Sequence, residues 1–213
     1  MADLEFFFDP VCPWAWITSR WVVNVQEQQN YQVNWRFISL YFLNDSNVAE
    51  WYDATYRAGH RAGLQALRVA DAVRLSHDNG AVGRFYTALG QAIHVGQLDR
   101  ADLRNKTVDV IAAALAAASL PAELAAEADR ESHDAHLRNE TELALSRTGK
   151  DVGTPILTFK PGQASEGSFF GPVLSRAPRG QAAVDLWNAI ELIATTSGMA
   201  ELKRSNRGRP QFD

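Results

Sequence analysis

The chain contains one cysteine, Cys12, and the residues around it place the thiol where it could act as a nucleophile. The apolar run 4–8 precedes it and is typical of a buried strand. Asp9-Pro10 ends this run, and Pro13 opens an apolar helical pattern directly after the cysteine. Cys12 is therefore expected at the N-terminus of a helix that emerges from a strand. Free N–H groups and the helix dipole stabilise a thiolate there, and such sites lower a cysteine pKa from about 8.5 to about 3.5–7.5.

The alternative is that Cys12 is only a small buried hydrophobe, because free cysteine is among the most buried residue types. Four features nevertheless agree on one geometry: a strand, a break in the pattern, a Cys-Pro pair and a helix. Their agreement favours a chemical role for the thiol.

The composition indicates an intracellular globular protein. A chain of 213 residues predicts one large domain, or one domain with an insertion, that needs no disulfide or metal to hold its core. A single cysteine forms no internal disulfide, which suits the reducing cytosol, so we expect a cytoplasmic location. The net charge of −4 argues against general nucleic-acid binding. No stretch approaches the roughly 18 apolar residues of a membrane span, and the N-terminus lacks the pattern of a signal peptide.

The residues after Cys12 predict a helix and a second strand. Apolar residues on most sides of segment 13–29 indicate a helix buried against a sheet. Residues 31–39 alternate, with Val33, Trp35 and Phe37 on one face, which is typical of a strand. Because a helix connects the two strands, we expect them to pair in parallel in a right-handed βαβ unit.

The rest of the chain predicts a long helical segment and then a return to the sheet. Several helices and no strand are expected over residues 44–149, which include an alanine-rich run of high helix propensity. Strand character returns at residues 156–159 and 169–170, and an amphipathic helix follows. We therefore expect an α/β fold in two parts: residues 1–43 together with 150–213, and an all-helical insertion over residues 44–149.

This order of elements, with a Cys-Pro pair opening the first helix, resembles the thioredoxin fold with the helical insertion of the DsbA family. Thr154-Pro155 stands directly before the third expected strand, where thioredoxin-like proteins place a cis-proline that faces the active cysteine. The resemblance implies a cis bond at Pro155 close to the Cys12 sulfur, with the peptide groups of Thr154 free to pair with a substrate. An ordinary trans-proline before a strand is the alternative.

A longer series of segments is similar to the actinobacterial DsbA-like proteins known as mycothiol-dependent nitroreductases, and it covers nearly the whole chain. The series comprises Phe8-Asp9-Pro10-x-Cys12-Pro13-Trp14-x-Trp16-Ile17-Thr18-Ser19-Arg20-Trp21, and segments 86–88, 93–94, 151–155, 170–175, 178–180, 201–204 and 210–213. The resemblance implies a thiol oxidoreductase with no tightly bound cofactor. Its co-substrate would be a low-molecular-weight thiol, mycothiol or its general equivalent glutathione, and its substrates disulfides or nitroaromatic compounds.

The chain departs from the dithiol members of that family at one position. They carry Cys-Pro-Trp-Cys, whereas Ala15 stands at the fourth position here, so this polypeptide is a monothiol. A mixed disulfide on Cys12 is therefore expected to be resolved by a second small thiol. Two other functions stay open. Kappa-class glutathione transferases and 2-hydroxychromene-2-carboxylate isomerases need no resolving cysteine, and a non-enzymatic redox sensor would only cap Cys12 reversibly.

The resemblance also implies a set of residues around the substrate and the thiol. The set is Pro13, Trp14, Asn44, Tyr56, His94, Thr154 and Pro155. Trp14 could equally pack against the insertion, and His94 could be a purely structural histidine. His133 and His136 could share a helix face, but no third ligand is evident, so no metal site is expected. An exposed alanine-rich or aromatic helix face leaves a homodimer open.

Overall fold

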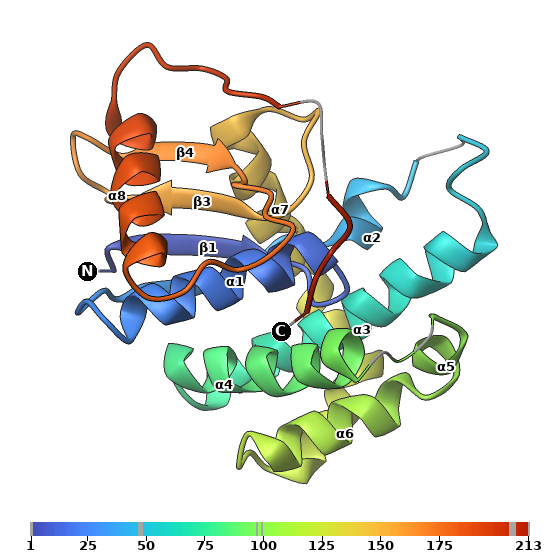
Figure 1. Cartoon of the computed structure of the whole chain (residues 1–213). Helices are drawn as coiled ribbons and strands as arrows, with labels where there is room; N and C mark the ends of the chain where they lie inside the picture. The colour runs from blue at the N-terminus through green and yellow to red at the C-terminus, as the bar shows by residue number, and fades with distance from the viewer. Residues whose placement is uncertain (1, 47–48, 97, 99, 205–207, 213) are drawn as a thin grey trace.

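The computed structural model, which describes residues 2–46, 49–96, 98, 100–204 and 208–212, contains a mixed four-stranded sheet and many helices (Figure 1). Asp213, the last residue of the C-terminal motif, lies outside the described residues. The strands are β1 (Leu4–Phe8), β2 (Val33–Phe37), β3 (Ile156–Phe159) and β4 (Gly167–Phe170). Their order across the sheet is β2-β1-β3-β4. β1 pairs with β2 in parallel, as predicted, whereas the other pairs are antiparallel.

Helices make up most of the remaining described chain. They are α1 (Pro13–Gln26), α2 (Leu40–Leu43), α3 (Ala54–Ser76), α4 (Asn79–Gly90), the π-helix η1 (Gln91–Val95), α5 (Arg100–Asn105), α6 (Thr107–Ala117), the 3₁₀ helices η2 (Ala122–Asp129) and η3 (Glu131–His133), α7 (Asp134–Thr148) and α8 (Gln181–Thr195). The architecture is compatible with a thioredoxin-like fold. No described helix is both long enough and apolar enough to cross a membrane.

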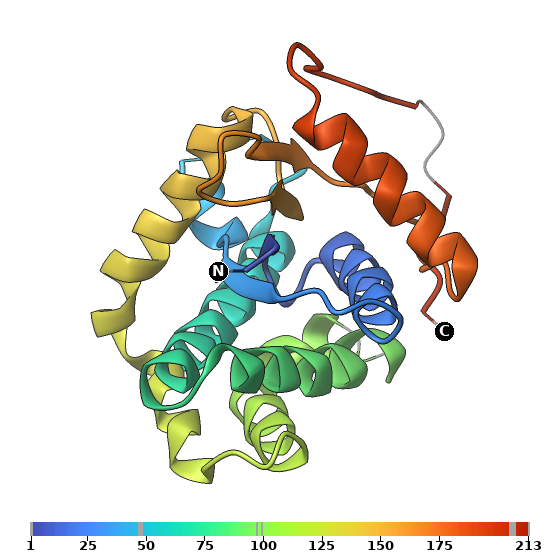
Figure 2. The same cartoon turned by 90° about the vertical axis from the view of Figure 1, so that its left-hand side faces the viewer.

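Helices cover both faces of the sheet (Figure 2). α1 and α8 lie on one face and α7 on the other, while α3, α4 and α6 gather beyond the β2 edge. All five residues of β1 are buried, which is expected of a strand covered on both faces. α1 and α8 are joined by the Trp21 indole, which donates a hydrogen bond to the Ala183 carbonyl at 2.8 Å.

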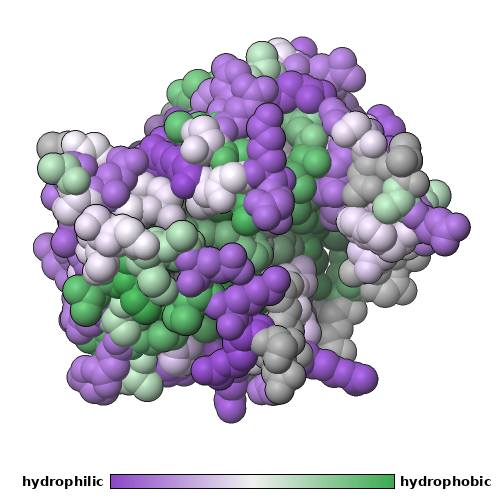
Figure 3. Space-filling view, turned by 90° about the horizontal axis from the view of Figure 1, so that it is seen from above, coloured by the Kyte–Doolittle hydropathy of each residue, from purple (hydrophilic) through white to green (hydrophobic). Residues whose placement is uncertain are grey.

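On the face seen from above, apolar side chains gather in patches between hydrophilic ones (Figure 3).

Several boundaries differ from the sequence prediction. α1 ends at Gln26 rather than near Gln29, and β2 is shorter than segment 31–39. The residues after Pro121 form a 3₁₀ helix, within the region where only helices are expected. Helix ends depend on tertiary contacts and caps as much as on periodicity, so these differences are local.

The edge strand β2 is protected by a side chain of α4. Trp35 N–H donates to the Asn79 Oδ1 atom at 2.9 Å, and Asn79 Nδ2 donates to the Val33 carbonyl at 2.6 Å. One amide group thus replaces the neighbouring strand that β2 lacks on this side. An unpaired edge would otherwise expose backbone groups that can pair with another chain.

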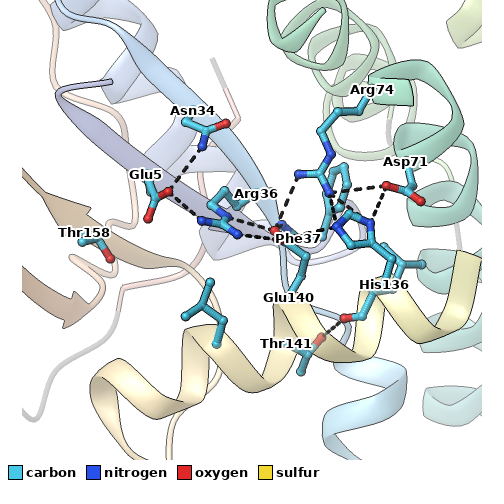
Figure 4. Close-up of polar contacts among 12 residues, drawn as sticks. Glu5, Asn34, Arg36, Phe37, Asp71, Arg74, His136, Glu140, Thr141 and Thr158 are labelled. Carbon is cyan, nitrogen blue, oxygen red and sulfur yellow. Dashed lines mark hydrogen bonds and ion pairs between the residues drawn. The ribbon is translucent and has the colours of Figure 1, made fainter. Parts of the chain in front are cut away.

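A network of charged side chains fastens α7 to the sheet and to α3 (Figure 4). Arg36 of β2 contacts Glu5 of β1 at 2.6 Å and also forms a bidentate ion pair with Glu140 of α7. Arg74 of α3 lies 3.6 Å from Glu140 and 3.4 Å from Asp71. The side chains of Glu5 and Glu140 are less than a tenth exposed, so each carboxylate depends on its arginine partners.

Two histidines extend the network from the buried carboxylate of Asp71. His133 Nδ1 and His136 Nδ1 each lie 2.8 Å from an Asp71 oxygen, and His133 Nε2 lies 3.1 Å from Glu127. Within the described parts of the chain, no group of three or more histidine, cysteine, aspartate or glutamate side chains could hold a metal ion. The hydrogen bonds of the two histidines connect α3, η2 and α7.

Glu140 is the residue on which this network converges. Burial alone raises its pKa, but hydrogen bonds and charge from Arg36, with the charge of Arg74, outweigh burial and hold the pKa below its ordinary value. The folded state therefore binds fewer protons here than the unfolded state. The resulting stabilisation is present above the unfolded pKa and is lost as pH falls through the folded one.

We predict that Glu140→Gln lowers the free energy of unfolding by about 3–5 kcal/mol at neutral pH, because Arg36 is left buried without its main counter-charge. Urea denaturation followed by circular dichroism measures the change. Glu142→Gln, on the exposed side of the same helix, is the matched control and should stay within about 0.5 kcal/mol of wild type. Equal losses in the two variants would contradict a structural role for the network.

Candidate active site

Cys12 is the N-cap residue of α1, as the sequence predicts, and Pro13 is the first residue of the helix. The Cys12 sulfur accepts a hydrogen bond from Ala15 N–H at 3.5 Å and donates one to the Thr154 carbonyl at 3.5 Å. The residue is only 6% exposed. The Ala15 N–H directed at the sulfur favours the thiolate, which is the form that attacks, whereas the bond to the Thr154 carbonyl is made by the protonated thiol.

The turn that leads into Cys12 is organised by Asp9. Its backbone carbonyl accepts the Cys12 N–H at 3.1 Å, and its carboxylate accepts Val11 N–H at 3.0 Å. The other carboxylate oxygen accepts Leu40 N–H, at the start of α2, at 2.8 Å. Asp9 has no exposed surface, and this burial raises its pKa to about 7 in spite of the two hydrogen bonds from backbone N–H groups.

From the sequence, Asp9 is expected only to end the first strand. Its carboxylate is nevertheless the best-connected polar side chain beside Cys12. The sequence signal that points to Asp9 is a carboxylate three residues before the cysteine, directly after a mostly apolar strand.

Thr154 contacts the cysteine sulfur through its carbonyl, directly before Pro155 and the start of β3. The Thr154–Pro155 bond, expected in the cis form, is cis in the structure, and so is the Gly171–Pro172 bond, which the sequence analysis did not anticipate. Thr154 Oγ1 donates to the Phe7 carbonyl at 3.2 Å. The Pro155 carbonyl accepts Gly171 N–H at 2.8 Å. Hydrogen bonds from the Thr154 side chain and to the next carbonyl, that of Pro155, therefore hold the segment that contacts the Cys12 sulfur.

His94 lies behind the turn, in the π-helix η1. Its Nε2 atom lies 2.9 Å from the Pro10 carbonyl, and a carbonyl oxygen only accepts, so Nε2 carries the hydrogen. The ring is stacked on Trp16 with centroids 5.8 Å apart, and Phe212 near the C-terminus packs on it at 5.6 Å. Burial lowers the pKa of His94 to about 4, so the imidazole is neutral at pH 7.

The other expected site residues lie in the following positions. Trp14, in the first turn of α1, is partly buried and packs against the hydrophobic core. Asn44 ends α2 and donates from Nδ2 to the Leu40 carbonyl at 2.9 Å. Tyr56, in the first turn of α3, is 38% exposed and makes edge contacts with Trp51 and His60. The structure thus brings Thr154 into contact with the Cys12 sulfur, with Pro13 and Pro155 next to these two residues in the chain, and these four residues are called the centre of the candidate site. His94 adjoins this centre through Pro10, and Asn44 through Leu40.

The low pKa of His94 predicts a pH-dependent contribution to stability. The unfolded state binds the proton below pH 6.5, whereas the folded state binds it only below about pH 4. The contribution of His94 is therefore full above 6.5 and declines as pH falls toward 4. We expect the stability gap between wild type and His94→Gln to narrow across this window by about 2–3 kcal/mol, at about 1.36 kcal/mol per pKa unit.

Denaturant titrations of both proteins at several pH values measure the gap. His77→Gln, at the exposed end of α3, controls for the loss of an imidazole as such. A gap that stays constant through the window would contradict the buried, neutral state of His94.

Comparison with known proteins assigns the chain to a family. A family model described as "Rv2466c-like: Mycothiol-dependent nitroreductase Rv2466c" matches residues 11–204, which include Cys12, Thr154 and Pro155. The chain is 30% identical over 208 residues to "Uncharacterized protein Rv2286c" of Mycobacterium tuberculosis (strain ATCC 25618 / H37Rv), an alignment that covers 96% of this chain and 82% of the relative. The match spans most of the chain and contains the whole site centre, so the protein belongs to the Rv2466c-like family of mycothiol-dependent nitroreductases.

Proposed function

We propose that the protein is a thiol oxidoreductase in which Cys12 acts as a single nucleophilic thiol and a low-molecular-weight thiol completes each cycle. The observation that carries the proposal is the position of the Cys12 sulfur, which accepts the Ala15 N–H and contacts the Thr154 carbonyl. Membership of a family named for a mycothiol-dependent nitroreductase supports mycothiol as the thiol, with glutathione as its general equivalent. The proposed substrates are disulfides and nitroaromatic compounds.

The first half of the proposed cycle forms a mixed disulfide. The Cys12 thiolate attacks one sulfur of a disulfide, a new sulfur–sulfur bond forms, and the other sulfur leaves as a thiolate that takes a proton from water. A second small thiol then attacks the mixed disulfide, which regenerates Cys12 and releases a new disulfide. Ala15 has no sulfur, so this second step cannot be internal.

A nitroaromatic substrate would use the same two thiols as its electron source. One nitro group, the Cys12 thiol and one small thiol give a nitroso group, the mixed disulfide on Cys12 and one water. The two electrons come from the two sulfur atoms. A further small thiol then returns Cys12 to its reduced form, as in the disulfide reaction.

We also propose that the seven residues implied by the family resemblance border the substrate. The set is Pro13, Trp14, Asn44, Tyr56, His94, Thr154 and Pro155. The contact of Thr154 with the sulfur and the exposed ring of Tyr56, beside Trp51, support two ends of such a pocket. His94 would hold the Pro10 carbonyl rather than transfer protons, because its pKa of about 4 keeps the imidazole neutral at pH 7 and its Nε2 hydrogen is bonded to that carbonyl.

For the architecture we propose a thioredoxin-like domain of residues 1–43 and 150–213, with residues 44–149 as a helical insertion of the DsbA type. The helices α3 to α6, which pack mainly on one another, support this division. α7 belongs to the proposed insertion by sequence, yet its Glu140 and Arg147 bond to β1 and β2 through Glu5, Arg36 and their neighbours. The insertion would therefore include one helix that also covers the sheet.

The first prediction from this function is a covalent adduct on Cys12. Incubation of the reduced protein with oxidised mycothiol or oxidised glutathione should raise its intact mass by one thiol, and fresh reduced thiol should remove the increase. Cys12→Ser should show no increase. Wild-type protein that forms no adduct at neutral pH would contradict the proposed function. Full conjugating activity in Cys12→Ser with added thiol would instead assign the protein to the transferase class.

The second prediction concerns Ala15, which is fully buried one helical turn from the sulfur. In Ala15→Cys, the new thiol should attack the mixed disulfide on Cys12, release one small thiol and leave an internal disulfide. We expect the wild-type adduct to persist after excess reagent is removed, and the variant adduct to be lost without added thiol. Time-resolved intact mass measures both, and Ala15→Ser is the matched control. Equal adduct lifetimes in all three proteins would contradict the monothiol mechanism.

A further inference from the structure

Asp9 joins three elements at the point where Cys12 enters its helix. It fixes the turn of residues 9–12 through Val11 N–H and its own carbonyl, and it holds the first N–H of α2 at Leu40. α3 closes the third side. A Cβ atom on Gly63 would lie 2.6 Å from Asp9 Oδ1, so only glycine lets the helix approach so closely. The carboxylate is thus enclosed by elements from both parts of the chain.

The ionisable side chains near Asp9 include Tyr52 before α3 and Tyr86 on α4, whose pKa values are raised by burial and by the charge of Asp9. Cys12 lies on the same turn, and His94 of η1, neutral at pH 7, bonds to the Pro10 carbonyl of that turn. The α2 and α3 contacts are the backbone N–H of Leu40 and the uncharged Gly63.

Burial raises the pKa of Tyr86 far above its ordinary value. A hydrogen bond with Ser19 and the charge of Arg20 lower this pKa, whereas the negative charges of Cys12 and Asp9 raise it. Both charges therefore act on one buried hydroxyl. Among the described residues, no lysine, arginine or histidine forms an ion pair with Asp9.

We propose that Asp9 is a positioning residue for Cys12, whose carboxyl group holds the turn that presents the thiol and whose protonation state sets how much of that thiol is ionised. The inference rests on the proposed function, because it concerns how the nucleophile of that reaction is activated.

The sign of the coupling follows from like charges in a buried site. An ionised Asp9 repels a thiolate three residues away, and no cation of the described chain is paired with Asp9 to offset this repulsion. A protonated Asp9 removes the repulsion and leaves the Ala15 N–H to stabilise the sulfur. Because burial raises the pKa of Asp9 to about 7, the carboxyl changes state in the neutral range, and the two groups titrate as a coupled pair.

The decisive test leaves Asp9 itself unchanged. Cys12 is alkylated either with iodoacetamide, which leaves a neutral cap, or with iodoacetate, which leaves an anionic cap in place of the thiolate charge. Carbon-13 NMR then follows the Asp9 carboxyl through pH. We expect the Asp9 midpoint to lie higher with the anionic cap, by about one pH unit, which corresponds to about a tenfold change in the ionised fraction. Equal midpoints would overturn the inference.

A substitution tests the same coupling from the other side, since coupling between two sites is reciprocal. The Cys12 thiol of Asp9→Asn should ionise at lower pH than that of wild type, as followed by thiolate ultraviolet absorbance and by alkylation rate. Asp185→Asn makes the same chemical change on the exposed side of α8 and should leave the thiol midpoint unchanged. Identical midpoints in wild type and Asp9→Asn would contradict the inference.

The outcomes separate this inference from the proposed function. If Cys12 forms the small-thiol adduct but the titration midpoint of Asp9 is the same with the neutral and the anionic cap, the inference about Asp9 fails and the proposed function stands. If no adduct forms, the proposed function fails whatever Asp9 does.

Discussion

The turn between β1 and α1 carries the constraint on which the rest of the structure depends. The Cys12 sulfur accepts a helix N–H where the chain leaves the strand, and hydrogen bonds to Asp9 hold the turn between strand and helix. Parallel pairing of β1 with β2 places Phe8 and Phe37, the last residues of the two strands, side by side at the same end of the sheet. One buried carboxylate therefore holds the exits of both strands, since Leu40 begins the helix that follows β2.

α3 connects this turn to the far side of the sheet. Near its middle, Gly63 packs directly on Asp9, and about two turns later Asp71 and Arg74 bond to side chains of α7. α7 is in turn tied to β2 through Arg36. The helical residues between β2 and β3 thus share contacts with the site and with the sheet. A buried ionic network adds little net stability to such an arrangement, because each partner offsets the desolvation of the others, but loss of one partner leaves the rest uncompensated.

Local chemistry made part of this arrangement predictable from sequence. Pro13 predicts the helix start, the alternation around Trp35 predicts β2, and the Thr154-Pro155 pair points to the segment that contacts Cys12. These signals are short-range, since each depends on the preferences of neighbouring residues. The role of Asp9 was not predictable in this way. Its carboxylate binds Leu40, 31 positions away, and its burial depends on how closely a helix packs against it.

The long-range polar contacts could not be predicted from the sequence for the same reason. The ion pair between Arg36 and Glu140 joins residues 104 positions apart, and each side chain alone is consistent with an exposed charged residue. His94 illustrates the intermediate case: the resemblance placed it near the site, but only the tertiary contacts with Pro10 and Trp16 show that it is buried and neutral. Periodicity predicts which face of an element is buried, whereas it does not predict which polar groups meet there.

Ala15 separates two properties that a dithiol site combines. Activation of Cys12 uses the backbone N–H of residue 15, which alanine supplies as well as cysteine does. Resolution of a mixed disulfide uses the side chain, which alanine lacks. The thiol that resolves the mixed disulfide must therefore come from solution. It has to reach the sulfur of Cys12, a residue that is 6% exposed and contacts the Thr154 carbonyl. So little exposed surface favours a small thiol over a folded protein as the resolving partner. Mycothiol, for which the family is named, is a thiol of this class.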